Sequence, residues 1–367
     1  MRFLFYFSHP AQYLSMRETI RRLLAKPDNH ATVLIRTKDV LEDLIKHDGI
    51  PYTNFLPRQR GTSRLAMALS LLKRVLLLLP IIWKKKPDLL IGTDAALAQV
   101  GKLLAISRIT ILEDDCAVIK SLANLTYPYT QTILCPDVCD VGRWQDKKVG
   151  YAGYMKLGYL HPAVFCPDNT VQARYGLHQS YVLVRLSKLG AHHDFDIRGI
   201  DPLLLDAIIY EVVERQGYQL WITSEGAMSE PYRRYQLQIH PADMHSVLAN
   251  ATLLISDSQS MSVEAAVLGI PSIRYSDLVG RISVLNELES RYRLTIGIPV
   301  SQREQLLPTV QEVLTTEELL AVYQARRQHM LRDKIDVTSF WVDFFENYAV
   351  GIKFKPTNRP RATGINT

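Results

Sequence analysis

The sequence predicts an α/β protein of two domains, each built on a doubly wound parallel sheet. The chain has 367 residues, longer than a single hydrophobic core usually grows, so two domains of roughly 170 residues each are expected. Hydrophobic residues make up 47% of the chain and charged residues 22%, as in ordinary globular proteins. Short apolar runs alternate with helical patterns along most of the chain, and this alternation is typical of parallel α/β units.

We expect the first domain to span residues 1–165. Strands are predicted at residues 3–7, 32–35, 89–91, 109–112 and 132–134, with helices from about residue 14, at 40–47, across a long basic segment and from residue 95. Polar residues follow three of these strands, at Ser8-His9, Thr93-Asp94 and Glu113–Asp115. Because ligands of doubly wound sheets sit beyond the carboxyl ends of the strands, these loops should face one cleft.

The alternation breaks at about residues 151–168, which we interpret as a hinge, and then restarts in a second domain expected over residues 166–335. Strands are predicted there at 181–186, 219–223, 252–256 and 272–275. An aromatic-rich terminal helix at 336–350 is expected to pack back on the first domain. Residues 351–367 hold four basic and no acidic side chains, and we expect them to be disordered.

The most informative segment joins the predicted strand at 252–256 to a helix expected over 261–268. A buried strand that runs through a small polar turn into a helix directs backbone amides and the helix N-terminus at one spot, which favours an anion such as a diphosphate. Glu264 lies about one turn into the helix, where its carboxylate could accept hydrogen bonds from ribose hydroxyls. The alternative is that Glu264 merely favours the helix through its dipole, although no Ser stands three residues before it to form a capping box. The residues assigned to the nucleotide here are Ser258, Gln259, Ser260 and Glu264.

Other loops of the second domain should contribute to the same site. Arg185, Ser187 and Lys188 follow its first strand, and cations with a hydroxyl suit a diphosphate. The alternative for Arg185 is an ion pair with a surface carboxylate. His192 carries less weight, because a histidine in a polar loop is more often solvated than catalytic. Two further strand ends supply Glu225, Gly226 and His240.

The catalytic residues are expected in the first domain. His9 is the leading general base, because it follows the first strand and an imidazole titrates near neutral pH. Its alternative role is that of a turn residue bonded to the backbone. Asp94, Asp114 and Asp115 are rivals, and clustered carboxylates raise one another's proton affinity. No spacing typical of metal ligands occurs, so we predict no bound metal and no cofactor; cations and helix dipoles would stabilise a diphosphate instead.

The block Ser256–Pro271, with Glu264 in its helix and Gly269-Ile270-Pro271 after it, resembles the nucleotide-sugar motif of GT-B glycosyltransferases and of the related non-hydrolysing UDP-N-acetylglucosamine 2-epimerases. Within that group it resembles an uncharacterised GT-B-like family catalogued as a domain of unknown function, over residues 1–345. The stretches that carry the resemblance are YAGY at 151–154, YLHP at 159–162, VRLSK at 184–188, AH at 191–192, and SQSMSVEAA at 258–266, followed by GIP at 269–271. Lys188 departs from the family, which usually has an acidic residue at this position.

The resemblance implies a GT-B architecture of two Rossmann-like domains, in which the segment around His240 covers the nucleotide base. It also implies a glycosyltransferase that moves a sugar, with UDP as the expected carrier, to a glycan or lipid-linked acceptor in cell-surface polysaccharide synthesis. A 2-epimerase and a non-catalytic nucleotide-sugar-binding protein are the alternatives, because one architecture hosts many activities.

The net charge of +6 is concentrated in one segment. Residues 56–87 hold eight Lys or Arg and no Asp or Glu, so the rest of the chain carries a net charge of −2. A basic and apolar helix over 58–86 is typical of a segment that lies on an anionic membrane surface; the alternative is a buried helix with solvated basic ends. Nucleic acid is not expected, because no aromatic-interleaved basic stripe accompanies the charge.

The cysteine pattern and the first residues favour a cytoplasmic protein. Cys116, Cys135, Cys139 and Cys166 show no CxxC spacing, which indicates reduced thiols. The apolar run at residues 3–7 is too short for the hydrophobic region of a secretory signal.

Overall fold

A computed structural model describes residues 1–37, 40–56, 64–186, 199–224, 228 and 230–349; for residues 64–68 and 349 only the backbone is described. The chain divides into two compact units. The first comprises Met1–Tyr159 together with the C-terminal segment from Asp333, and the second comprises Leu160–Arg332. The division thus falls a few residues before the predicted boundaries at 165 and 335, and the predicted disordered tail at 351–367 lies outside the described residues.

The first unit is built on a parallel sheet whose described strands run in the order β3-β2-β1-β4-β5-β6-β7. The strands are β1 (Arg2–Phe7), β2 (His30–Arg36), β3 (Thr53–Leu56), β4 (Leu89–Gly92), β5 (Ser107–Ile111), β6 (Thr132–Pro136) and β7 (Lys148–Tyr151). The helices are α1 (Pro10–Leu24), α2 (Leu41–His47), α3 (Arg64–Lys85), α4 (Ala95–Leu103), α5 (Lys120–Thr126) and α14 (Val337–Ala349), with a 3₁₀ turn η1 (Gly142–Lys147). The central strands are continuous apolar runs because helices cover both faces of the sheet.

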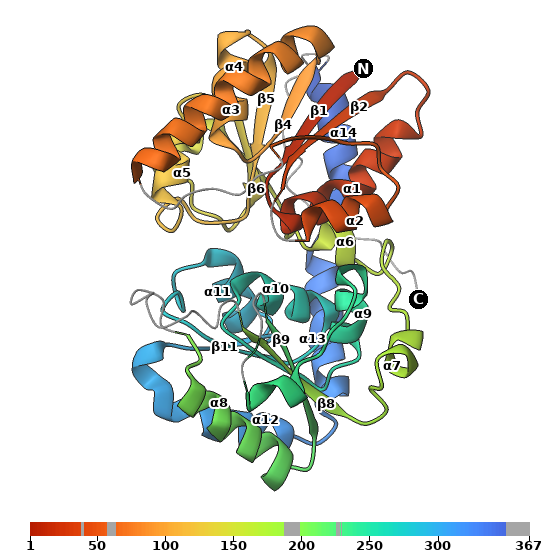
Figure 1. Cartoon of the computed structure of the whole chain (residues 1–367), viewed down its shortest axis with the longest axis vertical. Coiled ribbons are helices and arrows are strands. Elements are labelled where there is room, and N and C mark those ends of the chain that lie inside the picture. Colours follow the sequence, from red (N-terminus) through yellow and green to blue (C-terminus); the bar gives the residue numbers. More distant parts are fainter. Residues whose placement is uncertain (38–39, 57–63, 187–198, 225–227, 229, 350–367) are drawn as a thin grey trace, which may run out of the picture. The chain divides into compact units, whose positions relative to one another are not determined.

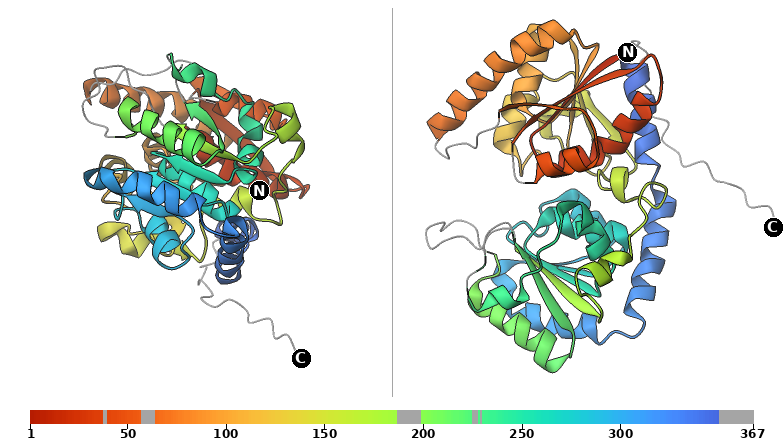
Figure 2. Two further views of the ribbon diagram at one scale, coloured as in Figure 1. Left: turned by 90° about the horizontal axis from the view of Figure 1, so that it is seen from below. Right: turned by 45° about the vertical axis from the view of Figure 1, so that its right-hand side comes forward.

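The helices of the first unit form two layers. Helix α4 contacts α3 and α5 on one face of the sheet, and α1, α2 and α14 lie on the other (Figure 1). Helix α14, drawn in blue, packs beside the red α1 (Figure 1, and the right-hand view of Figure 2). The C-terminal helix therefore completes the core of the first unit, although more than 300 residues separate it from α1.

The second unit has a smaller parallel sheet, with the described strands in the order β12-β11-β10-β8-β9. The strands are β8 (Tyr181–Leu186), β9 (Gln219–Ser224), β10 (Leu253–Ser256), β11 (Ser272–Tyr275) and β12 (Ile296–Ile298). Its helices are α7 (Thr170–Arg174), α8 (Pro202–Ile209), which continues as a π-helical turn η2 (Tyr210–Arg215), α9 (Met244–Ala249), α10 (Gln259–Leu268), α11 (Ser283–Ser290), α12 (Leu306–Leu314) and α13 (Leu319–Asp333). Short 3₁₀ turns are η3 (Tyr232–Tyr235), η4 (Pro241–Asp243) and η5 (Val300–Gln305), and α6 (Leu157–Leu160) lies at the division between the units. Helices α9, α10 and α11 cover one face of the sheet, and α8 and α12 cover the other (Figure 1).

Both sheets reverse their strand order at one point. In the first unit β1 leads to β2 on one side, while β4 lies on its other side. In the second unit β8 leads to β9 on one side, while β10 lies on its other side. Connections leave these two strand pairs in opposite directions, which opens a crevice beyond their carboxyl ends, the usual ligand position in such sheets. The predicted residues His9 and Asp94 follow β1 and β4, and Ser258 follows β10.

The central strands lie where the apolar runs of the sequence predict them, but three of the four edge strands carry no such run. These strands are β3, β7 and β12, and most of their residues are only partly buried. An edge strand needs no continuous apolar run, so its pattern is weak. The predicted hinge at 151–168 is correspondingly too long, because Tyr151 ends β7 and the carbonyl of Ala152 accepts a hydrogen bond from the N–H of Ile335 in the first unit.

Two helices begin earlier than predicted. Helix α1 starts at Pro10 and α10 at Gln259. Proline at the first helical position has no N–H to leave unsatisfied and is set to a helical φ, so it starts a helix as readily as it ends one.

Replacement of Trp341 by Ala tests whether α14 is part of the core of the first unit. Trp341 is fully buried, and its ring lies 5.6 Å from that of Tyr151 between centroids. It also packs against the backbone at Gly158, where a Cβ would come within 2.8 Å of the indole. The free energy of unfolding should fall by about 3–5 kcal/mol in urea denaturation. Asp343→Ala, at an exposed position of the same helix, is the control, and equal losses for both variants would contradict the packing.

Candidate functional site

The turn between β10 and α10 in the second unit uses its own polar groups to fix its shape. The N–H of Ser258 donates to the Ser256 Oγ at 2.8 Å, and the N–H of Asp257 donates to the carbonyl of Arg185 at 3.4 Å. Ser258 is the N-cap of α10, with its Oγ accepting from the N–H of Met261 at 3.4 Å. The amides of the turn itself, which the sequence analysis directed at the ligand, are therefore already occupied.

The first two amides of α10 remain available. In the described part of the chain, the backbone N–H groups of Gln259 and Ser260 have no acceptor. The first turn of α10 holds no acidic side chain that would compete for the positive end of the helix dipole. An anion at this position would satisfy both donors.

A buried arginine holds the start of α10 against the sheet. Arg274 lies inside β11 with no solvent exposure, and its Nη1 donates to the Oε1 of Gln259 at 2.7 Å. Its Nη2 lies 3.7 Å from the Oε2 of Glu289. Burial lowers the pKa of the Arg274 guanidinium to about 10, which leaves it charged at neutral pH. Because the Gln259 side chain accepts this hydrogen bond from Arg274, it fixes the position of the helix. Only the backbone N–H of Gln259 is left for the predicted ligand.

Glu264 has a partner that the sequence did not indicate. Its carboxyl is buried, with only 6% of the residue exposed, and its Oε1 lies 3.5 Å from the Nε2 of His245 on α9. The ring of Phe165 packs edge-on against this imidazole at 6.3 Å. The pair fixes the orientation of the Glu264 carboxylate. Glu264 is the sixth residue of α10, too far from the N-terminus of the helix to cap it.

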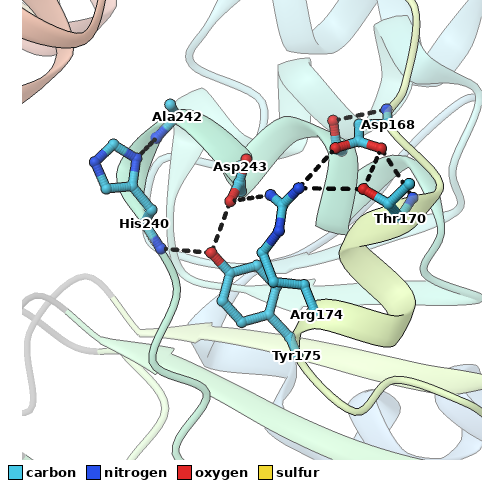
Figure 3. A network of polar contacts seen from close by, with 8 residues as sticks. Asp168, Thr170, Arg174, Tyr175, His240, Ala242 and Asp243 are labelled. Carbon is cyan, nitrogen blue, oxygen red and sulfur yellow. Dashed lines mark hydrogen bonds and ion pairs between the residues drawn. The ribbon is translucent and has the colours of Figure 1, made fainter.

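His240 lies in a segment held by a polar network (Figure 3). Its Nδ1 accepts from the N–H of Ala242 at 3.3 Å, and its backbone N–H donates to the hydroxyl of Tyr175 at 3.1 Å. The Tyr175 hydroxyl donates in turn to Asp243 at 2.7 Å, and the Arg174 Nη1 donates to the same carboxylate oxygen at 2.8 Å. The network ties the segment predicted to cover the base to α7, and gives it a fixed backbone path.

Arg185 lies in a row of residues at the carboxyl ends of the strands. Across the sheet the paired positions are Gly297, Arg274, Ser256, Arg185 and Thr223. Residues in one row point to the same face of a sheet, so the Arg185 side chain shares the face that α10 covers. The remaining predicted donor residues, Ser187, Lys188, His192, Glu225 and Gly226, lie outside the described residues.

In the first unit, His9 makes the backbone contact that was its alternative role. It is the N-cap of α1, and its Nδ1 accepts from the N–H of Ala11 at 3.2 Å. The Oε1 of Gln12 accepts from the N–H of Ser8 at 2.9 Å and closes the same turn. A neutral imidazole that accepts at Nδ1 carries its proton at Nε2. His9 is therefore better suited to donate a hydrogen bond than to act as a base through Nε2.

Asp94 also has a structural task. It is the N-cap of α4, and its Oδ1 accepts from the N–H of Ala96 at 2.8 Å and from the Nε of Arg74 at 3.2 Å. Both partners of this ion pair are buried, and removing either one would leave an uncompensated charge. The pair fastens α3 to the turn after β4.

The acidic cluster after β5 divides by role. Glu113 accepts from the Nζ of Lys156 at 2.8 Å and from the N–H of Met155 at 2.6 Å. Asp115 is buried and accepts from the N–H of Asp140 at 2.6 Å. Asp114 makes no hydrogen bond or ion pair with any residue that the structure describes. It reaches solvent, but desolvation by the surrounding protein, together with the charge of Glu113, raises the pKa of its carboxyl. Of the four predicted catalytic residues, Asp114 best fits a proton acceptor.

Two residues that matter here escaped the sequence analysis. A charged residue within the apolar strand at 272–275 was a signal for Arg274, since such a charge needs buried partners. No sequence signal pointed to His245, because its contact with Glu264 joins two helices. Among the described residues no group of three or more His, Cys, Asp or Glu side chains is placed to hold a metal ion.

The arrangement of the chain is shared with known enzymes. S. aureus MnaA, solved with UDP, matches with a TM-score of 0.70 at 12% identity, over 98% of this chain and 100% of that one. The UDP-GlcNAc 2-epimerase of Neisseria meningitidis, bound to UDP-GlcNAc, matches with a TM-score of 0.69 at 13% identity, over 95% and 100%. The spinosyn forosaminyltransferase SpnP matches with a TM-score of 0.64 at 14% identity, over 95% and 99%.

The chain has the GT-B fold. At these identities the likeness is one of fold, shared by epimerases and glycosyltransferases alike. No protein-family model and no curated protein sequence matches the chain, so the resemblance to one uncharacterised GT-B-like family stays a prediction.

Replacement of Asp114 by Asn should stabilise the protein at neutral pH. A raised pKa means that the folded chain holds this proton more tightly than the unfolded chain does. The protonated Asp114 carboxyl therefore contributes to the free energy of unfolding at pH below the unfolded pKa. This contribution is lost as the pH rises through the folded pKa. The Tm of Asp114→Asn should exceed that of the unchanged protein at neutral pH, and the two should converge below the ordinary Asp value of 3.8.

Asp146→Asn is the matched control for this measurement, because Asp146 is exposed and has no hydrogen-bond partner in the described ranges. Its Tm should follow that of the unchanged protein at both pH values. A lower Tm for Asp114→Asn at neutral pH would contradict the assignment.

Proposed function

We propose that the chain is a nucleotide-sugar-dependent glycosyltransferase that binds a UDP-sugar at the β10–α10 turn of the second unit. The observation that carries this proposal is the pair of unoccupied N–H groups at Gln259 and Ser260, at the strand-order reversal beside β8. Two backbone donors at a helix N-terminus suit the diphosphate, and the helix dipole adds to their attraction. Solved proteins of the same fold bind UDP or UDP-GlcNAc.

The remaining donor contacts follow from the same unit. The carboxylate of Glu264, oriented by His245, is assigned to the ribose hydroxyls. The His240 segment, held to α7 by Tyr175 and Arg174, is assigned to the base. Arg185 is assigned to the diphosphate, whose charge its guanidinium would offset. The leaving UDP would thus be stabilised by fixed donors and a cation, without a metal ion.

The acid–base inventory of the first unit favours transfer over epimerisation. Epimerisation at a carbon needs a proton taken from one face and another returned to the opposite face. Transfer to an acceptor hydroxyl with inversion needs one base. Asp94, Glu113 and Asp115 are each engaged by a cation or a backbone N–H, so among the predicted catalytic residues Asp114 is assigned as the base and His9 as a hydrogen-bond donor. The acceptor is proposed to be a glycan or a lipid-linked sugar.

A UDP-GlcNAc 2-epimerase is the second candidate function. The observation that favours it is the match to the N. meningitidis epimerase, whose TM-score of 0.69 exceeds the 0.64 of the glycosyltransferase SpnP. The nucleotide site proposed above serves either reaction. The two differ in the need for an acceptor.

Incubation with UDP-sugars separates these activities. A transferase releases UDP only when an acceptor is present, and Asp114→Asn should lower that rate about 100-fold or more through loss of the base. The exposed Asp146→Asn serves as the control. If NMR shows that UDP-GlcNAc is converted to its 2-epimer without an acceptor, the protein is an epimerase and the proposed transferase activity is wrong. Binding of UDP with neither reaction, across a panel of glycan acceptors, would mark a binding protein.

Replacement of Glu264 by Gln tests the nucleotide site itself. Loss of hydrogen bonds to a charged acceptor should weaken UDP binding roughly 10–100-fold in calorimetric titration. Glu312→Gln, exposed on α12, should leave the Kd unchanged. His245→Phe should weaken binding by a smaller factor, because it frees the carboxylate to rotate without removing it. Unchanged affinity in Glu264→Gln would place the nucleotide elsewhere.

A further inference from the structure

Helix α3 of the first unit presents an apolar face to solvent. Among its residues with described side chains, the exposed ones are Leu69, Leu72, Lys73, Leu76, Leu77, Pro80, Trp83, Lys84 and Lys85. Leu69, Leu72 and Leu76 are 60%, 56% and 60% exposed, and Trp83 is 70% exposed. These positions recur at three- and four-residue intervals, so they form one stripe along the helix. We call this stripe the outer face of α3.

The opposite side of α3 already forms the core. Leu78 and Ile82 are fully buried against Leu4, Tyr6 and Leu90, and Arg74 on the same side forms the ion pair with Asp94. Figure 1 shows α3 packed beside α4 on one face of the sheet. The inner side of α3 therefore supplies the core contacts of this helix, and the apolar side chains of the outer face are not needed for packing against the sheet. Large contiguous apolar patches on a soluble surface usually mark an interaction site.

Charge indicates the occupant of this face. Lys73 interrupts the apolar stripe, and Lys84, Lys85 and Lys86 follow Trp83 directly. Residues 56–87 contain no acidic side chain, and Asp88, which follows them, is paired with Arg2 at 3.3 Å. A basic edge beside exposed leucines and a tryptophan matches a bilayer surface, where anionic headgroups lie above the acyl chains. Tryptophan favours that boundary.

A second copy of this chain fits the same face less well. In a two-fold dimer each outer face would meet its own kind, so the lysines of both copies would be brought together. Like charges without acidic partners oppose such an interface. No described helix is long and apolar enough to cross a membrane, and the inner side of α3 is committed to the core.

We propose that the outer face of α3 docks the protein on an anionic bilayer surface, with the leucines and Trp83 at the acyl boundary and Lys73 and Lys84–Lys86 among the headgroups. The helix would lie parallel to the surface while its inner side stays packed on the sheet. This docking is independent of the reaction the protein catalyses.

Flotation of the whole chain with lipid vesicles tests the proposal. The protein should bind vesicles of phosphatidylcholine with about a quarter phosphatidylglycerol, bind pure phosphatidylcholine far more weakly, and be released by high salt. Changing Lys84, Lys85 and Lys86 together to Glu should lower the partition coefficient on the order of a hundredfold. Changing the same three to Arg keeps the charge and should keep the binding.

The apolar part needs its own variant. Leu72→Gln, Leu76→Gln and Trp83→Gln combined should lower the partition coefficient at least about tenfold. The matched control is Leu125→Gln, Leu203→Gln and Leu320→Gln combined, three exposed leucines on other helices, which should bind as the unchanged protein does. Circular dichroism without lipid checks that every variant is folded, because basic residues at a helix C-terminus also stabilise the helix.

Four outcomes would overturn the docking. They are absence of binding to anionic vesicles at low salt, equal binding to neutral and anionic vesicles, unchanged binding in folded outer-face variants, and a dimer in sedimentation equilibrium that the apolar variant converts to a monomer. The last would assign the outer face to a second copy of the chain.

Discussion

The charge of Arg274 inside the second sheet is the constraint on which the candidate nucleotide site depends. A guanidinium with no solvent exposure requires partners, and it finds them in the Gln259 side chain and in Glu289. Gln259 is the first residue of α10, so the bond that stabilises the charge also fixes where the helix begins. The unoccupied N–H groups of Gln259 and Ser260 are thereby held at one position before any ligand arrives, which lowers the entropy lost on binding.

The two units use their polar residues in different ways. In the second unit, pairing prepares a site, because Arg274 places a helix N-terminus and His245 orients Glu264. In the first unit most of the acidic groups near the strand ends have structural roles, because Asp94, Glu113 and Asp115 form hydrogen bonds or ion pairs that hold helices and turns in place. Asp114 stands apart with a raised pKa. A carboxyl that is destabilised when ionised is a better proton acceptor than its paired neighbours, and such strain in a fold is usually found where chemistry occurs.

The predictions from sequence succeeded where burial leaves a pattern. The central strands are apolar on both faces because helices cover them, and their runs stand out. Strands β3, β7 and β12 lie at edges, are only partly buried, and were missed. The turn after β10 leads into a helix as the sequence predicts, but the amides of the turn itself are not available to a ligand. Ser256 Oγ and the Arg185 carbonyl occupy those of Ser258 and Asp257, and the available donors lie one step further along the helix.

By itself the sequence determined the two α/β units, the turn that carries Ser258 and Glu264, and the basic apolar segment that became α3. These features follow from local periodicity and from residue types at strand ends. Only the tertiary structure decided which donors remain unoccupied, that His245 orients Glu264, that Asp114 alone of its cluster is unpaired among the described residues, and that α3 has a second apolar face. The reason is physical. Hydrogen-bond occupancy, desolvation and exposure depend on groups distant in the chain, whose proximity no local pattern records.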